Sequence, residues 1–318
     1  MNKFLAKSFS FFVLFLFGCY LLDYIICTGL KKTEEYYFQT WTNIVESKIN
    51  ADVLISGNSR AFNNYCPQIL DTILQVNAYN IGIGGYPFDA QYLRYRLYEK
   101  YNKKPQLIIQ NIDFGTLKHY DFGHEREQVF PFTSVELMRK GLRNFGFTWL
   151  ELYLPLYRYF GYQMVIKKGI LEYFGIKHYN QQASKKGYKP EDIHGGVWDG
   201  SGLKNIKNIE VSCDPSVIRL FEEFLMHCKN EKIKVVLVNS PIYYKASQKI
   251  VNNHKFNSLI NSLSKKYNAP YLDFTKDPIC SDTANFRISV HMNKEGGELF
   301  SKKLAYMIKE MNILNASK

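Results

Sequence analysis

Short apolar runs alternate with helical segments along most of this chain, and each run ends in small or polar residues. The predicted strands lie within residues 52–55, 76–87, 106–114, 233–239 and 270–274. The predicted helices lie at 88–100, 215–230, 251–267 and 294–305. Strands that alternate with helices form parallel sheets through right-handed crossovers. The sequence therefore predicts a three-layer α/β/α sandwich with a parallel central sheet.

Ser59 stands where the first predicted strand ends and the backbone must turn sharply. Residues 57–59 are small and turn-prone, which suits the presentation of a hydroxyl at the tip of a turn. A serine in this place can be a nucleophile or an ordinary turn residue. Ligands bind at the carboxyl ends of parallel strands, where we expect Ser59, Gly85, Asp113 and Ser240 to emerge.

His291 lies near the other end of the chain, shortly before Asn293. Asn293 can cap the helix predicted at 294–305, and that cap would hold His291 at a junction between a loop and a helix. A serine hydroxyl is a weak nucleophile until a base accepts its proton. Ser59 and His291 are therefore the candidate nucleophile and base of a serine hydrolase.

Taken in order, four segments resemble the blocks of the SGNH (GDSL-like) hydrolase superfamily, especially its membrane-anchored branch associated with acylation of cell-surface polysaccharides. The four segments are residues 52–60, 76–87, 106–114 and 289–296. Outside 1–45 and 120–210, the resemblance covers most of the chain. It implies that Ser59 is the nucleophile and His291 the base. It also implies that the backbone N–H groups of Ser59 and Gly85 hold the oxyanion.

The third block departs from the family pattern. That block normally supplies an Asn side chain to the oxyanion hole, and here either Asn111 or Asp113 stands at that place. An anionic Asp113 would oppose oxyanion formation if it faced the site. It would have to be protonated, turned toward a backbone N–H, or paired with a cation such as Arg60. Asn58, before the nucleophile, also replaces the usual Asp.

The fourth block departs as well, because the family usually has an Asp three residues before the histidine and this chain has Ile288. A backbone carbonyl, Ser289, or a more distant carboxylate such as Asp282 or Asp273 then remains to orient the imidazole. Serine–histidine dyads work without a third group, since that group chiefly sets tautomer and orientation. A degenerate site is equally compatible with this departure.

The N-terminal residues 8–30 are apolar apart from Asp23, and lysines flank both ends of this run. About 20 mostly apolar residues span the hydrocarbon core of a bilayer. We expect residues 1–32 to form a cytoplasmic tip and signal anchor in the bacterial inner membrane, with the main domain outside the cytoplasm. A cleaved signal peptide, a lipobox at 16–19 and a buried core helix are the alternatives.

Residues 33–318 are expected to form one domain with an insertion at about 120–210. The insertion is rich in aromatic residues, which either pack in a core or roof the site and stack on sugar rings. Candidate sugar contacts are Tyr188, His194 and Trp198, together with Tyr243 in the loop after residue 239.

The net charge of +12 is spread along the chain rather than gathered in one patch with aromatic residues, which argues against nucleic-acid binding. Anionic lipid or an acidic glycan is a more natural partner, and a solvated lysine-rich surface explains the charge equally simply. The six cysteines show no spacing suited to zinc. We expect no metal and no cofactor.

Two classes of function follow from these features. The first is an esterase or O-acyltransferase that acts on acyl esters, with acetyl the expected acyl group, of an extracytoplasmic polysaccharide or envelope polymer. The second is a catalytically degenerate protein of the same fold that binds glycan or scaffolds a membrane-bound acyltransferase. Its support comes from Ile288 and the altered third block.

Overall fold

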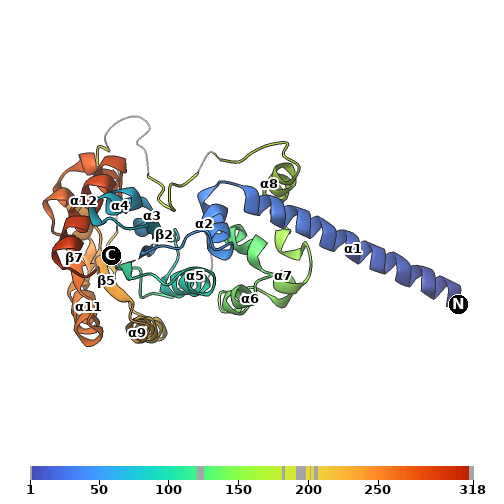
Figure 1. Ribbon diagram of the computed structural model, residues 1–318, viewed down its shortest axis with the longest axis horizontal. Coiled ribbons are helices and arrows are strands. Elements are labelled where there is room, and N and C mark those ends of the chain that lie inside the picture. The colour runs from blue at the N-terminus through green and yellow to red at the C-terminus, as the bar shows by residue number, and fades with distance from the viewer. Residues whose placement is uncertain are drawn as a thin grey trace. The chain divides into compact units, whose positions relative to one another are not determined.

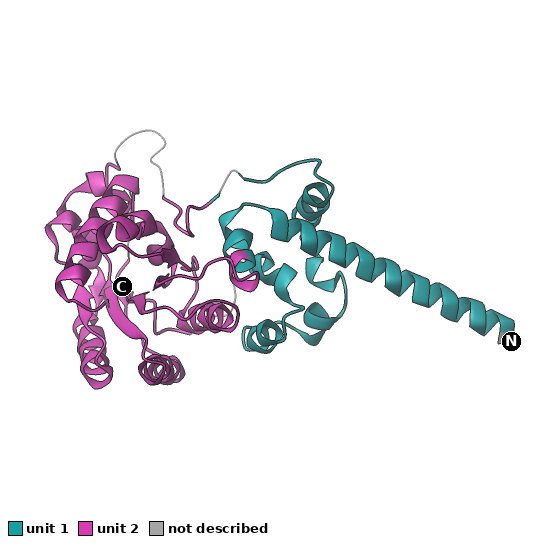
Figure 2. Cartoon of the chain, viewed as in Figure 1, with its two compact units in different colours: residues 1–42, 121–183 teal, residues 43–120, 184–318 magenta. Residues whose placement is uncertain are grey.

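The structure is a computed structural model of the 318-residue chain (Figure 1). It describes residues 2–119, 125–180, 183–190, 198–200, 202–203 and 207–314. The chain divides into two compact units (Figure 2). Unit 1 comprises residues 1–42 and 121–183, and unit 2 comprises residues 43–120 and 184–318.

A five-stranded parallel sheet forms the centre of unit 2. Its strands, in spatial order, are β2 (Ala78–Asn80), β1 (Val53–Ser56), β3 (Leu107–Asn111), β5 (Lys234–Asn239) and β7 (Tyr271–Asp273). Every residue of β1 and β3 is buried, and each strand begins with three apolar residues and ends in polar ones. The predicted parallel sheet is confirmed.

Helices flank this sheet and cover its apolar side chains. They are α3 (Ser59–Asn64), α4 (Pro67–Leu74), α5 (Phe88–Tyr101), α9 (Pro215–Asn230), α10 (Tyr244–Ser247), α11 (Asn253–Tyr267) and α12 (Lys294–Glu310). Val53 and Ile55 of β1 share one core cluster with Phe300 and Leu304 of α12. Phe88 of α5 packs edge-on against the aromatic rings of α9. The α/β/α prediction therefore holds, and four of these helices lie where the sequence predicts them.

Unit 2 also contains short elements that the sequence analysis does not resolve. They are the 3₁₀ turns η4 (Pro278–Ser281) and η5 (Thr283–Asn285), the parallel pair β4 (Ile209–Glu210) and β6 (Ile250–Val251), and the antiparallel pair β8 (Phe286–Ile288) and β9 (His291–Met292). The last pair carries the candidate base.

Unit 1 is helical. Its elements are α1 (Asn2–Lys32), α2 (Tyr36–Val45, which runs into unit 2), η1 (Arg126–Phe132), α6 (Glu136–Arg143), α7 (Trp149–Tyr153), η2 (Tyr157–Tyr159) and α8 (Gln163–Tyr173). Its core contains buried residues from both stretches of chain, among them Ile26, Leu30, Trp41, Phe130 and Met138. Residues 121–183 thus fold together with the N-terminal helix. Lys189, beyond them, donates its N–H to the Phe62 carbonyl in unit 2.

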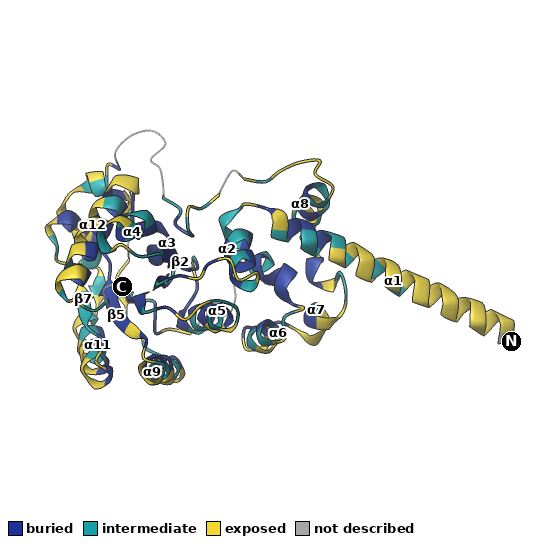
Figure 3. Ribbon diagram, in the orientation of Figure 1, coloured by how far each residue is buried: buried dark blue, intermediate teal, exposed yellow. Residues whose placement is uncertain are grey.

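Helix α1 is long and apolar enough to cross a bilayer. Its large apolar side chains up to Leu22 are mostly exposed, whereas Ile26 and Leu30 are fully buried in unit 1. The apolar run predicted at 8–30 therefore has two environments (Figure 3). Its first part is mostly exposed among the residues that the structure describes, and its last two turns contribute to the core of unit 1.

Two glycines let α1 and α8 approach closely. A Cβ atom on Gly29 would lie 1.8 Å from the Gly169 carbonyl oxygen, and a Cβ atom on Gly169 would lie 2.7 Å from the Ile26 carbonyl oxygen. Both contacts are with backbone, which cannot move aside as a flexible side chain can. The crossing therefore depends on the absence of side chains at both positions.

Replacing Gly29 with leucine should separate α1 from α8 and destabilise unit 1 by about 1–3 kcal/mol, the usual cost of overpacking. Thermal unfolding of the full chain in detergent measures the change, followed by the emission of Trp41 with Trp149 and Trp198 replaced by phenylalanine in all variants. Gly18→Leu is the matched control, because a Cβ atom there meets nothing within 4 Å. Equal midpoints for the two variants would contradict the assigned crossing.

Candidate active site

A tight turn after β1 presents Ser59. Gly57 has a φ of +150°, and a Cβ atom there would lie 2.7 Å from the Cβ atoms of Ala61 and Asn111. Only glycine fits such a turn without displacing its neighbours. Asn58 caps α3, because its Oδ1 accepts the Arg60 N–H at 3.0 Å. Ser59 is the first residue of α3, and its side chain is half-buried.

The β8–β9 hairpin brings His291 to Ser59. The His291 Nε2 atom lies 3.0 Å from Ser59 Oγ, although the two residues are 232 positions apart in the sequence. Met292 donates its N–H to Asn64 Oδ1 at 3.1 Å, which ties β9 to the helix that begins with Ser59. Asn293 caps α12 through the Gly296 N–H, as predicted. The structure thus brings together the two residues that the sequence singles out.

The carboxylates considered as orienters of His291 are engaged in local turns. Asp282 Oδ1 accepts the Ala284 N–H at 2.9 Å and caps η5. Asp273 Oδ1 accepts the N–H and the hydroxyl of Thr275. Ile288 is exposed and pairs with His291 across the hairpin. We therefore assign neither carboxylate to the imidazole.

Asp113 is buried behind the nucleophile, and its charge is compensated. Its Oδ2 accepts a hydrogen bond of 2.8 Å from Asn58 Nδ2 and lies 3.4 Å from Arg60 Nη1. Its Oδ1 accepts the Gly115 N–H at 2.9 Å. Of the three possibilities raised by the sequence, the structure therefore contains two, the pairing with Arg60 and the bond to a backbone N–H.

Arg60 connects this carboxylate to the loop after β5. Its Nη2 atom donates to the Ser240 carbonyl and, at 3.4 Å, to the Pro241 carbonyl. The side chains of Arg60 and Asp113 are only 4% and 2% exposed. A guanidinium donates five N–H bonds in a fixed plane, which suits it to join two elements in this way. Arg60 therefore ties the first turn of α3 to Asp113 and to the loop after β5.

Asn111 is buried beneath Asn58 and Asp113 and is not among the residues that line the cavity over Ser59. Its amide donates to Asn58 Oδ1 and Asp113 Oδ2, both at 3.4 Å, and its Oδ1 accepts the Tyr65 hydroxyl at 2.8 Å. Burial raises the pKa of Tyr65, so its phenol stays protonated and remains the donor. Asn111 is fully buried and committed to these partners. This geometry favours a supporting role for it over contact with an oxyanion.

A cavity of about 210 Å³ opens over the nucleophile. It is lined by Asn58, Ser59, Arg60, Gly85, Tyr86, Asp113, Phe114, Gly115, Val290 and His291. Both residues expected to supply oxyanion N–H groups, Ser59 and Gly85, are among them. Four lining residues were not predicted from the sequence: Tyr86, Phe114, Gly115 and Val290. Tyr86, Phe114 and Val290 each directly adjoin a predicted residue.

The aromatic residues suggested as sugar contacts pack in the core instead. Tyr188, Trp198 and Tyr243 are all buried, and none of them lines the cavity over Ser59. The rings of Trp198 and Tyr243 meet edge-on with centroids 5.2 Å apart, and both belong to the main core cluster of unit 2. His194 lies outside the described residues.

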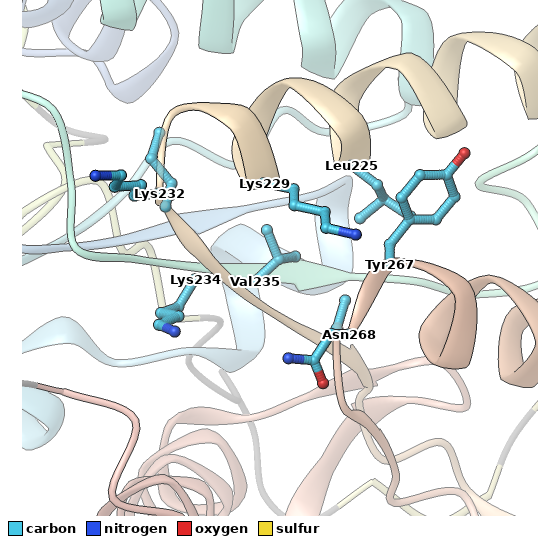
Figure 4. Close-up of a pocket in the computed structure, with 9 residues that line it drawn as sticks. Leu225, Lys229, Lys232, Lys234, Val235, Tyr267 and Asn268 are labelled. Atoms are coloured by element: carbon cyan, nitrogen blue, oxygen red, sulfur yellow. The ribbon is translucent and has the colours of Figure 1, made fainter.

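A second cavity, of about 430 Å³, lies near the start of β5 (Figure 4). Lys229, Lys232 and Lys234 line it together with Tyr267 and Asn268. It lies away from the carboxyl ends of the strands and contains no nucleophile paired with a base. Within the part of the chain that the structure describes, no group of three or more His, Cys, Asp or Glu residues is placed to hold a metal ion.

No protein-family model matches this chain, and no curated protein matches it. Several solved structures, including the three that follow, align with it at low similarity. A proposed acylhydrolase from Bacteroides fragilis has 13% identity and a TM-score of 0.38, with coverage of 82% of this chain and 88% of that one. A proposed lipolytic protein of the G-D-S-L family from Desulfitobacterium hafniense has 14% identity and a TM-score of 0.37, with coverage of 82% and 98%. A proposed platelet activating factor from Streptococcus pneumoniae has 12% identity and a TM-score of 0.42, with coverage of 95% and 99%.

Likenesses this weak do not establish a family or an activity for the chain. The chemistry therefore has to be inferred from the geometry around Ser59.

Proposed function

We propose that this protein is a membrane-anchored serine esterase or O-acyltransferase that acts on acyl esters of an extracytoplasmic polysaccharide or envelope polymer. The observation that carries the proposal is the contact of 3.0 Å between His291 Nε2 and Ser59 Oγ at a cavity. A nucleophile within hydrogen-bond reach of a base is the arrangement that covalent ester chemistry needs.

In the proposed reaction, His291 Nε2 accepts the Ser59 proton while Oγ forms a bond to the acyl carbonyl carbon. The tetrahedral oxyanion is held by the backbone N–H groups of Ser59 and Gly85. The carbon–oxygen bond to the leaving alcohol then breaks, and His291 returns the proton to that alcohol. Water or a sugar hydroxyl then attacks the acyl carbon while His291 accepts its proton. The bond between that carbon and Ser59 Oγ breaks, and His291 returns the proton to Oγ. Water makes the protein an esterase, and a sugar hydroxyl makes it an acyltransferase.

The cavity has a volume of about 210 Å³, and Tyr86, Phe114 and Val290 line it beside the nucleophile. The acyl group that we propose is acetyl. The apolar helix α1, which is long enough to cross a bilayer, supports attachment to a membrane. Placement at the inner membrane, with the α/β unit on the extracytoplasmic side, is part of the proposal.

Intact-mass analysis after treatment of the full chain in detergent with a fluorophosphonate probe tests the proposal. Wild-type protein should gain one adduct, and Ser59→Ala and His291→Ala should each prevent it. Ser258→Ala, an exposed serine on α11, is the control and should label like wild type. Folded wild-type protein without an adduct would overturn the enzymatic proposal and favour the non-catalytic alternative of glycan binding or scaffolding.

A further inference from the structure

Unit 1 carries an exposed apolar surface outside the long helix α1. It is formed by Trp149, Leu150, Tyr153, Leu154, Tyr157, Phe160 and Met164, which we call the apolar face. Phe160 is 90% exposed and Met164 is 73% exposed. Within this set, the rings of Trp149 and Tyr153 stack with their centroids 5.3 Å apart. Large exposed apolar side chains are typical of surfaces that contact a partner or a membrane.

Polar contacts determine which part of α1 this face lies beside. The Leu156 N–H donates to Asp23 Oδ1 at 2.9 Å, and Arg158 Nη2 donates to Asp23 Oδ2 at 2.6 Å. One turn later, Cys27 Sγ lies 3.2 Å from the Tyr159 hydroxyl. The segment that contains Tyr157 and Phe160 is therefore held beside residues 23–27 of α1.

Helix α8 runs in the same direction as α1. Gly169 packs on Ile26, and the Lys32 ammonium lies 5.1 Å from the centre of the Tyr173 ring. Met164, at the start of α8, therefore lies toward the N-terminal end of α1, and residues beyond Tyr173 lie away from it. Figure 3 shows α7 on the side of unit 1 from which the exposed part of α1 extends.

The usual length of a membrane span places residues 23–27 of α1 near the boundary between lipid and water. Lys7 is the last charged residue before the apolar run. If the hydrocarbon core begins there, the usual span of about 20 residues ends near Cys27. Asp23 then lies within the span, where an unpaired acid is costly. The ion pair with Arg158 satisfies it.

We propose that the apolar face of unit 1 is a membrane-binding platform that inserts into the interfacial layer of the bilayer beside α1. The contacts of residues 156–159 with Asp23 and Cys27 hold part of this face next to the stretch of α1 that is exposed, which favours lipid over protein as the partner. Trp and Tyr side chains, which form much of this face, are enriched at the boundary between lipid and water. The inference rests on the proposed membrane anchorage and not on the ester chemistry. Attachment through both α1 and this face fixes the orientation of unit 1 on the membrane.

Quenching of Trp149 by brominated lipid tests the platform. The full chain is reconstituted in vesicles of phosphatidylcholine and phosphatidylglycerol, with phosphatidylcholine brominated near the headgroup end of its acyl chains. Trp149 is 63% exposed, whereas Trp41 and Trp198 are buried. Brominated lipid should lower the emission of wild-type protein and leave that of Trp149→Phe nearly unchanged.

Aspartate substitutions locate the contact. The double variant Phe160→Asp/Met164→Asp should lose most of the quenching, because it places charge in the lipid. Ile176→Asp is the matched control, since Ile176 is 70% exposed but follows the far end of α8, and it should be quenched like wild type.

Extraction of the vesicles at alkaline pH distinguishes a failure of the platform proposal from a failure of the proposed anchor. Protein that stays in the membrane but shows no quenching specific to Trp149 would overturn the platform and leave the anchor standing. Protein that is released would overturn the anchorage, and the platform with it. Neither result would bear on fluorophosphonate labelling, which tests the ester chemistry separately.

Discussion

Ser59→Ala should lower kcat/KM for an activated acetyl ester by about 10⁴-fold or more, because the acyl-enzyme can no longer form. The substitution removes one oxygen atom from a half-buried site and leaves the capping bond of Asn58 to the Arg60 N–H in place. The unfolding midpoint should therefore stay close to that of wild type. Hydrolysis of 4-nitrophenyl acetate by the full chain in detergent measures the loss, with Ser258→Ala as the control.

His291→Ala should cause a loss of similar size, and the double variant should be no worse than either single variant. Residues that act as one unit in catalysis show this lack of additivity. The contact between Nε2 and Oγ is the physical reason, since each residue is effective only through the other. Additive losses, or a Ser59→Ala variant with wild-type activity, would show that these residues do not form the nucleophile and base.

The parallel sheet is predictable because its signal is local. Strands β1 and β3 are short apolar runs with buried residues throughout, and each is followed by residues suited to a turn. The Ser59–His291 pair is predictable for a related reason. Both residues lie beside features with strong local preferences, the turn at Gly57 and the cap at Asn293. The parallel topology then brings the strand ends to one edge.

The contacts that support the site are not predictable in the same way. Arg60 bonds the carbonyls of Ser240 and Pro241, and Asn64 bonds the Met292 N–H. Backbone carbonyls and N–H groups are present at every position, so no residue type marks the partner in advance. The sequence suggests that Arg60 pairs with Asp113, but it contains no sign of the link to the loop after β5.

The aromatic residues between 120 and 210 show a second limit. Rows of aromatic residues at helical spacing indicate packing or ligand contact equally well, and only tertiary structure separates the two. Trp198 packs on Tyr243 in unit 2, whereas Trp149 is exposed in unit 1. The association of residues 121–183 with α1 depends on the fit at Gly29 and Gly169 and on the Asp23–Arg158 pair. Each of these contacts joins residues more than 100 positions apart.

Arg60→Met should destabilise unit 2 by about 3–5 kcal/mol, because it leaves the buried carboxylate of Asp113 without its cation. Asn58 and Gly115 continue to donate to that carboxylate, but neither carries charge. The loss should also release the Ser240 and Pro241 carbonyls, so the variant should label poorly with the fluorophosphonate even where it remains folded. Lys104→Met, which breaks an exposed ion pair with Glu231, is the control and should change the midpoint little.

The double variant Arg60→Met/Asp113→Asn separates two effects of Arg60: its compensation of the Asp113 charge and its bonds to the Ser240 and Pro241 carbonyls. If the uncompensated carboxylate causes most of the loss, removing its charge should restore part of the stability, and the double variant should be more stable than Arg60→Met alone. Urea unfolding followed through Trp198, the buried tryptophan of unit 2, measures this difference separately from unit 1 when Trp41 and Trp149 are replaced by phenylalanine in all variants. Losses that simply add would show that Arg60 acts through the Ser240 and Pro241 carbonyls and not through Asp113. Its role in holding Ser59 would then depend on the loop after β5.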